Sequence, residues 1–159
     1  MSVKTQPQNN TQRLSNSVLQ SFLELLPLRV RSSSQRLSKI AFQLVLLAGI
    51  MLVLDAIYLY STASLSLPVY QSIQGSPIKI HYGGAIACYL LMTLGLYYFI
   101  VRENRTPSEA FLMGLFVYGV YDMTTLAIFS KYTHSLAVMD MVWGGILFGT
   151  TTWIYKTLE

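Results

Sequence analysis

Long apolar runs are the feature that most constrains this chain. They cover residues 40–60, 78–101, 107–130 and 136–156, and each approaches the roughly 20 residues that a helix needs to cross a bilayer. Only 11% of the 159 residues are charged, whereas a soluble domain carries about 25%. The chain therefore cannot cover a surface that faces water. The runs predict an all-α polytopic membrane protein with four transmembrane helices.

Charge and cysteine content exclude some other classes. The net charge is +4, but most basic residues flank the apolar runs, so we predict no nucleic-acid partner. Cys88 is the lone cysteine, which rules out an intrachain disulfide and is typical of a small core residue. No phosphate loop, nucleophile elbow or haem-attachment motif is present, so we predict no catalytic residue and the cofactor stays unknown.

Residues 1–39 differ in composition from the rest of the chain. Residues 1–12 are polar, and from Leu14 apolar side chains recur at three- and four-residue steps, which is typical of an amphipathic helix. We expect this helix to lie in the membrane interface and to end at Pro27. The segment is also rich in Ser and Arg with Glu24 as its only acid, as in an organellar transit peptide. The sequence thus predicts a targeting or attachment segment at 1–39, before a bundle at 40–157.

Local signals place the ends of the predicted spans. Ser-rich residues 61–76 predict a connecting loop between the first two spans. Thr106, Pro107 and Glu109 form the pattern of a helix N-cap, first-turn proline and capping box, so the third span begins there. In the fourth span, Gly145 and Gly149 make a GxxxG pattern, which we expect to serve packing inside the bundle.

The distribution of Lys and Arg predicts the orientation. If the N-terminus lies inside, the outer side holds only Lys79 and Lys131, and the other nine of the 11 basic residues lie inside. Both termini then face the cytoplasm, or the matrix or stroma of an organelle. Aromatic residues fall near both interfaces, with Tyr60, Tyr82 and Tyr132 near the outer one.

Three aspartates form the main candidate site. Asp55, Asp122 and Asp140 lie within the spans, whereas all four Glu lie outside them or at their ends. At 1.5 Å per helical residue, the three lie about 9, 12 and 8 Å below the outer ends of their spans. Carboxylates from three helices thus share one depth in the outer half of the membrane. A charge in such a place is costly, and it marks a functional site by default.

Polar neighbours on the same helices complete the candidate binding site. Three close carboxylates cannot all remain ionised in a medium of low dielectric, so we expect them to share a proton, a cation or a Lys. His81, Lys79, Lys131 and His134 would cap the cluster from outside. The predicted ligand- or ion-binding residues are Asp55, Asp122, Asp140, Tyr58, Tyr118, Tyr121, Thr125, Trp143 and His81.

A structural role for these residues is the competing interpretation. An aspartate within the membrane can bond to Tyr, Trp or Ser and so lock helix packing. His81 alone is more typical of a solvated interfacial histidine than of a ligand. A site for a hard cation built from the three aspartates and His81 is conceivable, but no HxxE or paired His/Cys spacing supports it, so we predict no metal ligands.

Several motifs resemble a known family. LDAIYL in the first span, YGVYDMTTLA in the third and MDMVWGG in the fourth resemble the small bacterial predicted membrane proteins grouped as a domain of unknown function, through YGxYDxT and DxxWG patterns. The resemblance covers residues 40–157. It implies a four-helix membrane bundle with Asp55, Asp122, Asp140 and Trp143 at signature positions, and it implies no activity. The N-terminal extension departs from the compact bacterial pattern and suggests an organellar or otherwise specialised member.

Three functions remain open from the sequence. The first is a binding site, within the membrane, for a proton, a cation or a small polar or lipidic ligand, used in transport or sensing. The second is a structural or accessory subunit of a larger membrane complex, possibly organellar. The third is an enzyme acting on a lipid-soluble substrate. The expected partners are the lipid bilayer and either other membrane subunits or a second copy of the chain.

Overall fold

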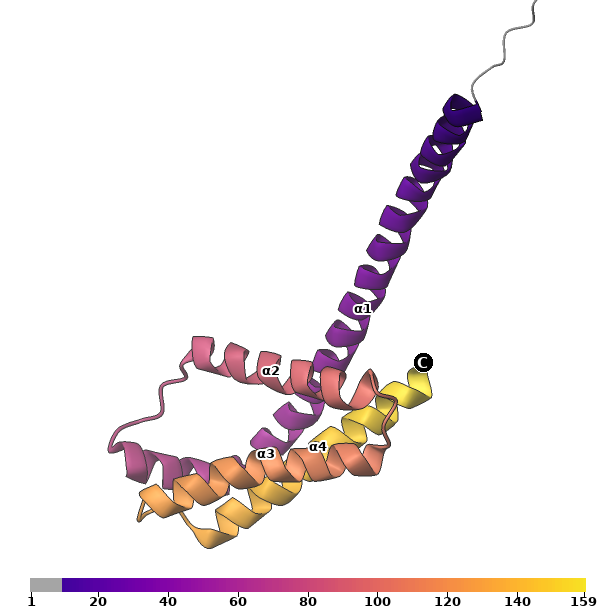
Figure 1. Ribbon diagram of the computed structural model, residues 1–159. Coiled ribbons are helices and arrows are strands. Elements are labelled where there is room, and N and C mark those ends of the chain that lie inside the picture. The colour runs from indigo at the N-terminus through magenta and orange to yellow at the C-terminus, as the bar shows by residue number, and fades with distance from the viewer. Residues whose placement is uncertain (1–9) are drawn as a thin grey trace, which may run out of the picture. The chain divides into compact units, whose positions relative to one another are not determined.

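A computed structural model (Figure 1) describes the backbone of residues 10–159 and the side chains of Ser17, Ser21 and residues 33–159. The elements are α1 (Asn10–Gln74), α2 (Tyr82–Leu96), the π-helical turn η1 (Tyr97–Val101), α3 (Pro107–Ile128) and α4 (His134–Leu158). The prediction of an all-α fold is therefore confirmed for this part of the chain. The polar segment 1–9 and most side chains of the predicted amphipathic helix lie outside the described residues.

Three helices in the described part are long and apolar enough to cross a membrane. They are Ser33–Gln74 within α1, Tyr82–Val101 across α2 and η1, and Pro107–Ile128 in α3. The fourth predicted span forms the 25-residue helix α4. Asp140, Lys156 and three consecutive threonines lower the hydropathy of α4, so composition does not identify it as a membrane span.

The chain comprises two compact units, residues 1–41 and 42–159. In the first unit the predicted end of a helix at Pro27 is wrong, because α1 continues through this position. A proline inside a helix removes one backbone hydrogen bond, and the leucine-rich flanks Leu25, Leu26 and Leu28 favour helix on both sides.

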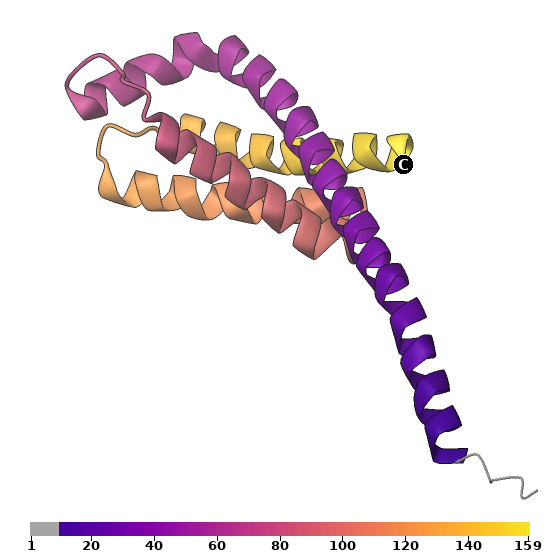
Figure 2. The ribbon, with the colours of Figure 1, turned by 90° about the horizontal axis from the view of Figure 1, so that it is seen from above.

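The predicted loop at residues 61–76 is also wrong, because α1 remains helical to Gln74. The hydroxyls of Ser61, Thr62 and Ser66 donate to backbone carbonyls four residues earlier, at 2.7, 2.8 and 3.2 Å. Ser-rich sequence is thus satisfied inside the helix, and such back-bonding bends helices. Pro68 adds a missing N–H, and Figure 2 shows α1 bending in this region.

The predicted start of α3 is confirmed. Thr106 is the N-cap, and its hydroxyl accepts from the backbone N–H of Glu109. The Glu109 carboxylate accepts in return from the Thr106 backbone N–H at 2.8 Å. Pro107 occupies the first helical turn. This reciprocal capping fixes the residue at which α3 begins.

Helices α3 and α4 run side by side along their lengths (Figures 1 and 2). Glycines permit the close approach: a Cβ added at Gly114 would lie 2.1 Å from the Gly144 carbonyl oxygen. The ring of Phe111 packs over Gly145, and its Cβ lies over Gly149. The GxxxG glycines of α4 therefore pack against α3 within the chain.

The core of this unit draws on all four helices. Fully buried residues include Leu47 and Met51 of α1, Leu96 of α2, and Leu147 and Phe148 of α4. A smaller cluster forms where Tyr132, Leu136 and Ala137 contact the end of α1. The second cluster exists because α1 continues beyond residue 60.

Candidate functional site

Asp55 joins three helices through two hydrogen bonds. Its side chain on α1 is 6% exposed. The Tyr89 hydroxyl of α2 donates to Oδ2 at 2.5 Å, and the indole Nε1–H of Trp143 on α4 donates to Oδ1 at 2.8 Å. Both carboxylate oxygens are thus satisfied by donors from other helices.

Asp140 on α4 accepts a hydrogen bond from α1. The hydroxyl of Tyr58 on α1 donates to its Oδ1. The Tyr58 ring in turn stacks on Trp143, with the ring centroids 4.3 Å apart and the planes 5° from parallel. The two aspartates lie close enough to interact electrostatically. Asp55 therefore accepts from Trp143, which lies one turn from Asp140, and Asp140 accepts from Tyr58, which lies one turn from Asp55.

Asp122 is the most secluded of the three. Its side chain on α3 is 0% exposed. The Tyr132 hydroxyl donates to Oδ1 at 2.7 Å, while Oδ2 is buried and has no hydrogen-bond partner among the described residues. One carboxylate oxygen is therefore left without a donor in an apolar interior.

Tyr70, near the end of α1, lies near both Asp122 and Asp140. Its ring centroid lies 6.1 Å from that of Tyr132, and its hydroxyl lies near the Tyr132 hydroxyl and the Asp140 carboxylate. Polar groups thus extend from Asp122 to Asp55. We call this set the aspartate–aromatic network; its members are Asp55, Asp122, Asp140, Tyr58, Tyr70, Tyr89, Tyr132 and Trp143.

Tyr58 and Trp143 each bond to an aspartate of the facing helix. Tyr58 lies three residues after Asp55, and Trp143 three residues after Asp140, so helical spacing alone would place each beside the aspartate of its own helix. Tyr58 instead donates to Asp140, and Trp143 to Asp55.

The other predicted side chains lie outside the network. The Tyr118 hydroxyl lies 3.6 Å from the Met92 sulfur, and Tyr121 is 61% exposed. Thr125 donates to the Tyr121 carbonyl at 2.8 Å. His81 is the N-cap of α2, where its Nδ1 accepts from the Gly84 N–H.

Lys131, one residue of the predicted basic cap, contacts the backbone of α1. Lys131 donates to the Ser72 carbonyl at 2.8 Å, so it secures the end of α1. Among the described residues, no group of three or more His, Cys, Asp or Glu side chains could hold a metal ion.

Sequence reasoning missed three tyrosines of the network. Tyr132 was placed in the outer aromatic belt, yet its side chain is 4% exposed. Tyr70 was placed in a loop that is helical. Tyr89 had a usable signal, because it lies in the middle of an apolar span, where a phenol hydroxyl needs a partner.

The chemistry of the network is that of carboxylates surrounded by donors. Tyrosine hydroxyls donate and accept, whereas an indole N–H only donates. Such groups stabilise a carboxylate and can pass a proton, but they supply few of the acceptor oxygens that a hard cation requires. The arrangement is suited to holding helices together and to binding protons.

Comparison with known proteins identifies one family. The family model described as "Predicted membrane protein (DUF2177)" matches residues 39–156, which is the part of the chain that carries the motifs. No curated protein and no solved structure matches the chain.

Proposed function

The chain belongs to the DUF2177 family of predicted membrane proteins, and from this premise we propose that it binds a proton at Asp122 within the membrane. The proton is exchanged with Asp140 through Tyr132 and Tyr70. The activity is proton-linked transport or sensing. The observation that carries the proposal is the buried Oδ2 of Asp122, which has no hydrogen-bond partner in the described part of the chain.

Burial determines the resting state of Asp122. A charged carboxylate in an apolar interior costs several kcal/mol unless it is paired, and Asp122 has one neutral donor on one oxygen. Protonation of Oδ2 removes the charge without any change in packing. Asp122 is therefore a group whose charge state depends on a bound proton.

The neighbouring hydroxyls provide the route. Each tyrosine hydroxyl can accept one proton while it donates another. In space, Tyr132 bonds to Asp122, and Tyr70 lies near both Tyr132 and Asp140. Asp140 interacts electrostatically with both Asp122 and Asp55. A proton gained by one carboxylate thus changes the energy of the next.

Sidedness follows if α4 also crosses the membrane. Its 25 residues extend about 37 Å at 1.5 Å per residue, and it packs against α3 along its length (Figure 2). With four crossings both termini face the side richer in Lys and Arg. The network then lies in the opposite half of the bilayer.

Infrared difference spectroscopy tests the proton directly. The full-length protein in lipid is titrated with pH, and we expect the carbonyl band of a protonated carboxyl group to be lost in Asp122→Asn. The matched control is Glu103→Gln, because Glu103 is 52% exposed and pairs with Arg102 at the surface. Identical difference spectra for wild type, Asp122→Asn and the control would overturn the proposal.

Vesicle measurements separate proton transfer from a purely structural role. With a pH-sensitive dye trapped inside, Tyr132→Phe should slow proton uptake while the protein stays folded, because the phenylalanine keeps the ring and removes the hydroxyl. No proton uptake by folded wild-type protein, with stable migration in a large assembly on native gels, would favour an accessory subunit instead.

A further inference from the structure

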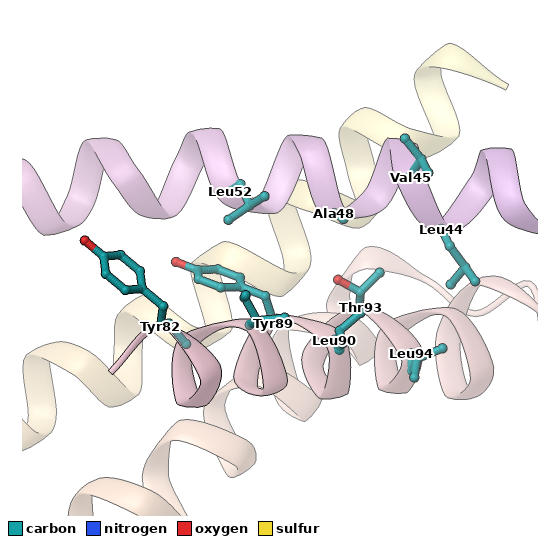
Figure 3. Close-up of a pocket in the computed structure, with 11 residues that line it drawn as sticks. Leu44, Val45, Ala48, Leu52, Tyr82, Tyr89, Leu90, Thr93 and Leu94 are labelled. Carbon is teal, nitrogen blue, oxygen red and sulfur yellow. The ribbon is translucent and has the colours of Figure 1, made fainter. Parts of the chain in front are cut away.

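An apolar groove lies between α1 and α2, and the network does not explain it. Figure 3 shows side chains of both helices around it. The cavity has a volume of about 390 Å³ and is lined by residues within 44–52 and 82–94. Val45, Leu52 and Leu90 at its edge are exposed, so the groove opens sideways, toward lipid.

Two hydroxyl groups lie just beneath the apolar surface of the groove. Tyr89 and Thr93 both line the groove, and because they are four residues apart they share one face of α2. In Figure 3 both project from α2 toward α1. The Tyr89 hydroxyl is committed to Asp55, whereas Oγ1 of Thr93 is buried and has no partner among the described residues. Thr93 itself is 4% exposed.

The depth of Thr93 limits what can satisfy it. Thr93 lies 11 residues into α2, about 16 Å along the helix and near the middle of a hydrocarbon layer of about 30 Å. A hydroxyl without a partner is costly there. Phospholipid tails carry no oxygen at this depth, so they cover the apolar wall but leave the hydroxyl unpaired.

We propose that this groove binds an uncharged lipid-soluble chain molecule with a carbonyl or hydroxyl oxygen within its apolar length, and that this oxygen bonds to Thr93. The ligand is uncharged because no charged side chain lines the groove, and a bare charge would be unpaired at this depth. The volume falls in the range of small-ligand sites, about 300–1,000 Å³, which combine apolar walls with a few polar groups. A threonine on a helix has two accessible rotamers, so its hydroxyl can turn toward the ligand oxygen.

Photocrosslinking of the full-length protein in lipid vesicles tests the proposal. One probe is a long-chain ketone with its carbonyl in mid-chain and a diazirine near one end. The matched probe is the same chain without the carbonyl, and a third is a phospholipid with the diazirine on one tail. We expect the ketone to label residues 44–52 and 82–94 about fivefold more than the chain without the carbonyl, the effect of one net hydrogen bond.

Variants assign the effect to the hydroxyl. Thr93→Val keeps the shape and removes the oxygen, so the ketone's advantage should disappear. Thr151→Val is the matched control, because Oγ1 of Thr151 is also buried and has no partner among the residues that the structure describes, but it does not line the groove. In this variant the advantage should remain. Ala48→Phe, which fills the groove from α1, should abolish labelling by every probe.

The opposite results are equally clear. Equal labelling by the ketone and the plain chain, unchanged in Thr93→Val, would show that the groove holds bulk lipid and overturn the proposal. Efficient labelling by the phospholipid at the expense of the ketone would do the same. Thermal unfolding of each variant in detergent establishes that the proteins compared are folded.

Discussion

Trp143 on α4 donates its indole N–H to the carboxylate of Asp55 on α1 at 2.8 Å, across 88 residues of sequence. The Tyr58 ring stacks on this indole, and its hydroxyl donates to Asp140, three residues before Trp143. The two contacts hold α1 against α4 in one register. Hydrogen bonds between helices stabilise a membrane protein by up to about 2 kcal/mol each, because lipid itself offers no partner.

Trp143→Phe should lower the free energy of unfolding by about 1–2 kcal/mol, because the ring still stacks on Tyr58 but Asp55 loses a donor. Denaturant unfolding in detergent, followed by circular dichroism, measures the change. Trp153→Phe is the control, since Trp153 is 61% exposed, and it should leave stability nearly unchanged. Equal effects of the two substitutions would mean that the hydrogen bond to Asp55 contributes little.

Tyr132 and Asp122 should show a measurable coupling energy. Tyr132→Phe leaves both oxygens of a fully buried carboxyl group without a donor, and we expect it to destabilise the protein by about 1–3 kcal/mol. In a double-mutant cycle with Asp122→Asn, the coupling should be about 0.5–3 kcal/mol. The same unfolding assay gives all four values.

A control cycle tests Tyr121 in place of Tyr132. Tyr121 neighbours Asp122 in sequence but is 61% exposed. Tyr121→Phe with Asp122→Asn should be additive within about 0.5 kcal/mol. A coupling as large for Tyr121 as for Tyr132 would contradict the hydrogen bond as its source.

The sequence alone predicts the start of α3 but not the end of α1. Composition predicted helices in apolar runs, and the capping pattern at Thr106 located the start of α3 correctly. The segment after residue 60 was read as a loop because serine and proline favour turns in water. Inside a helix its hydroxyls bond to their own backbone, a possibility that composition does not distinguish.

The aspartates illustrate the same limit at the candidate site. Their presence within the apolar runs was visible in sequence, as were Tyr58 and Trp143. Which aromatic residue serves which carboxylate depends on the rotation and register of helices far apart in sequence, and spacing on one helix cannot supply it. Tyr70 became a partner of the site only because α1 extends to Gln74.

Tags at the two termini should report the same side of the membrane. Four crossings require this outcome, and the excess of Lys and Arg on that side favours it. Protease protection of tagged protein in sealed inverted and right-side-out vesicles provides the measurement. Opposite sidedness would mean that α4 does not cross, and the predicted position of the network in the outer half would be wrong.

Gly114 should tolerate no side chain. A Cβ at this position would lie 2.1 Å from the Gly144 carbonyl oxygen and 2.9 Å from the Phe148 Cβ, and neither backbone nor buried ring can move aside cheaply. Gly114→Ala should therefore force α3 and α4 apart and destabilise the protein by about 3 kcal/mol, at the upper end of overpacking effects. Thermal unfolding in detergent measures it.

Gly49→Ala on α1 is the matched substitution, because nothing lies within 4 Å of the added Cβ. Alanine exceeds glycine in helix propensity by about 1 kcal/mol, so this variant should be as stable as the wild type or slightly more so. The two substitutions differ only in what the methyl group meets. A harmless Gly114→Ala would show that α3 and α4 are farther apart than the glycine contact requires.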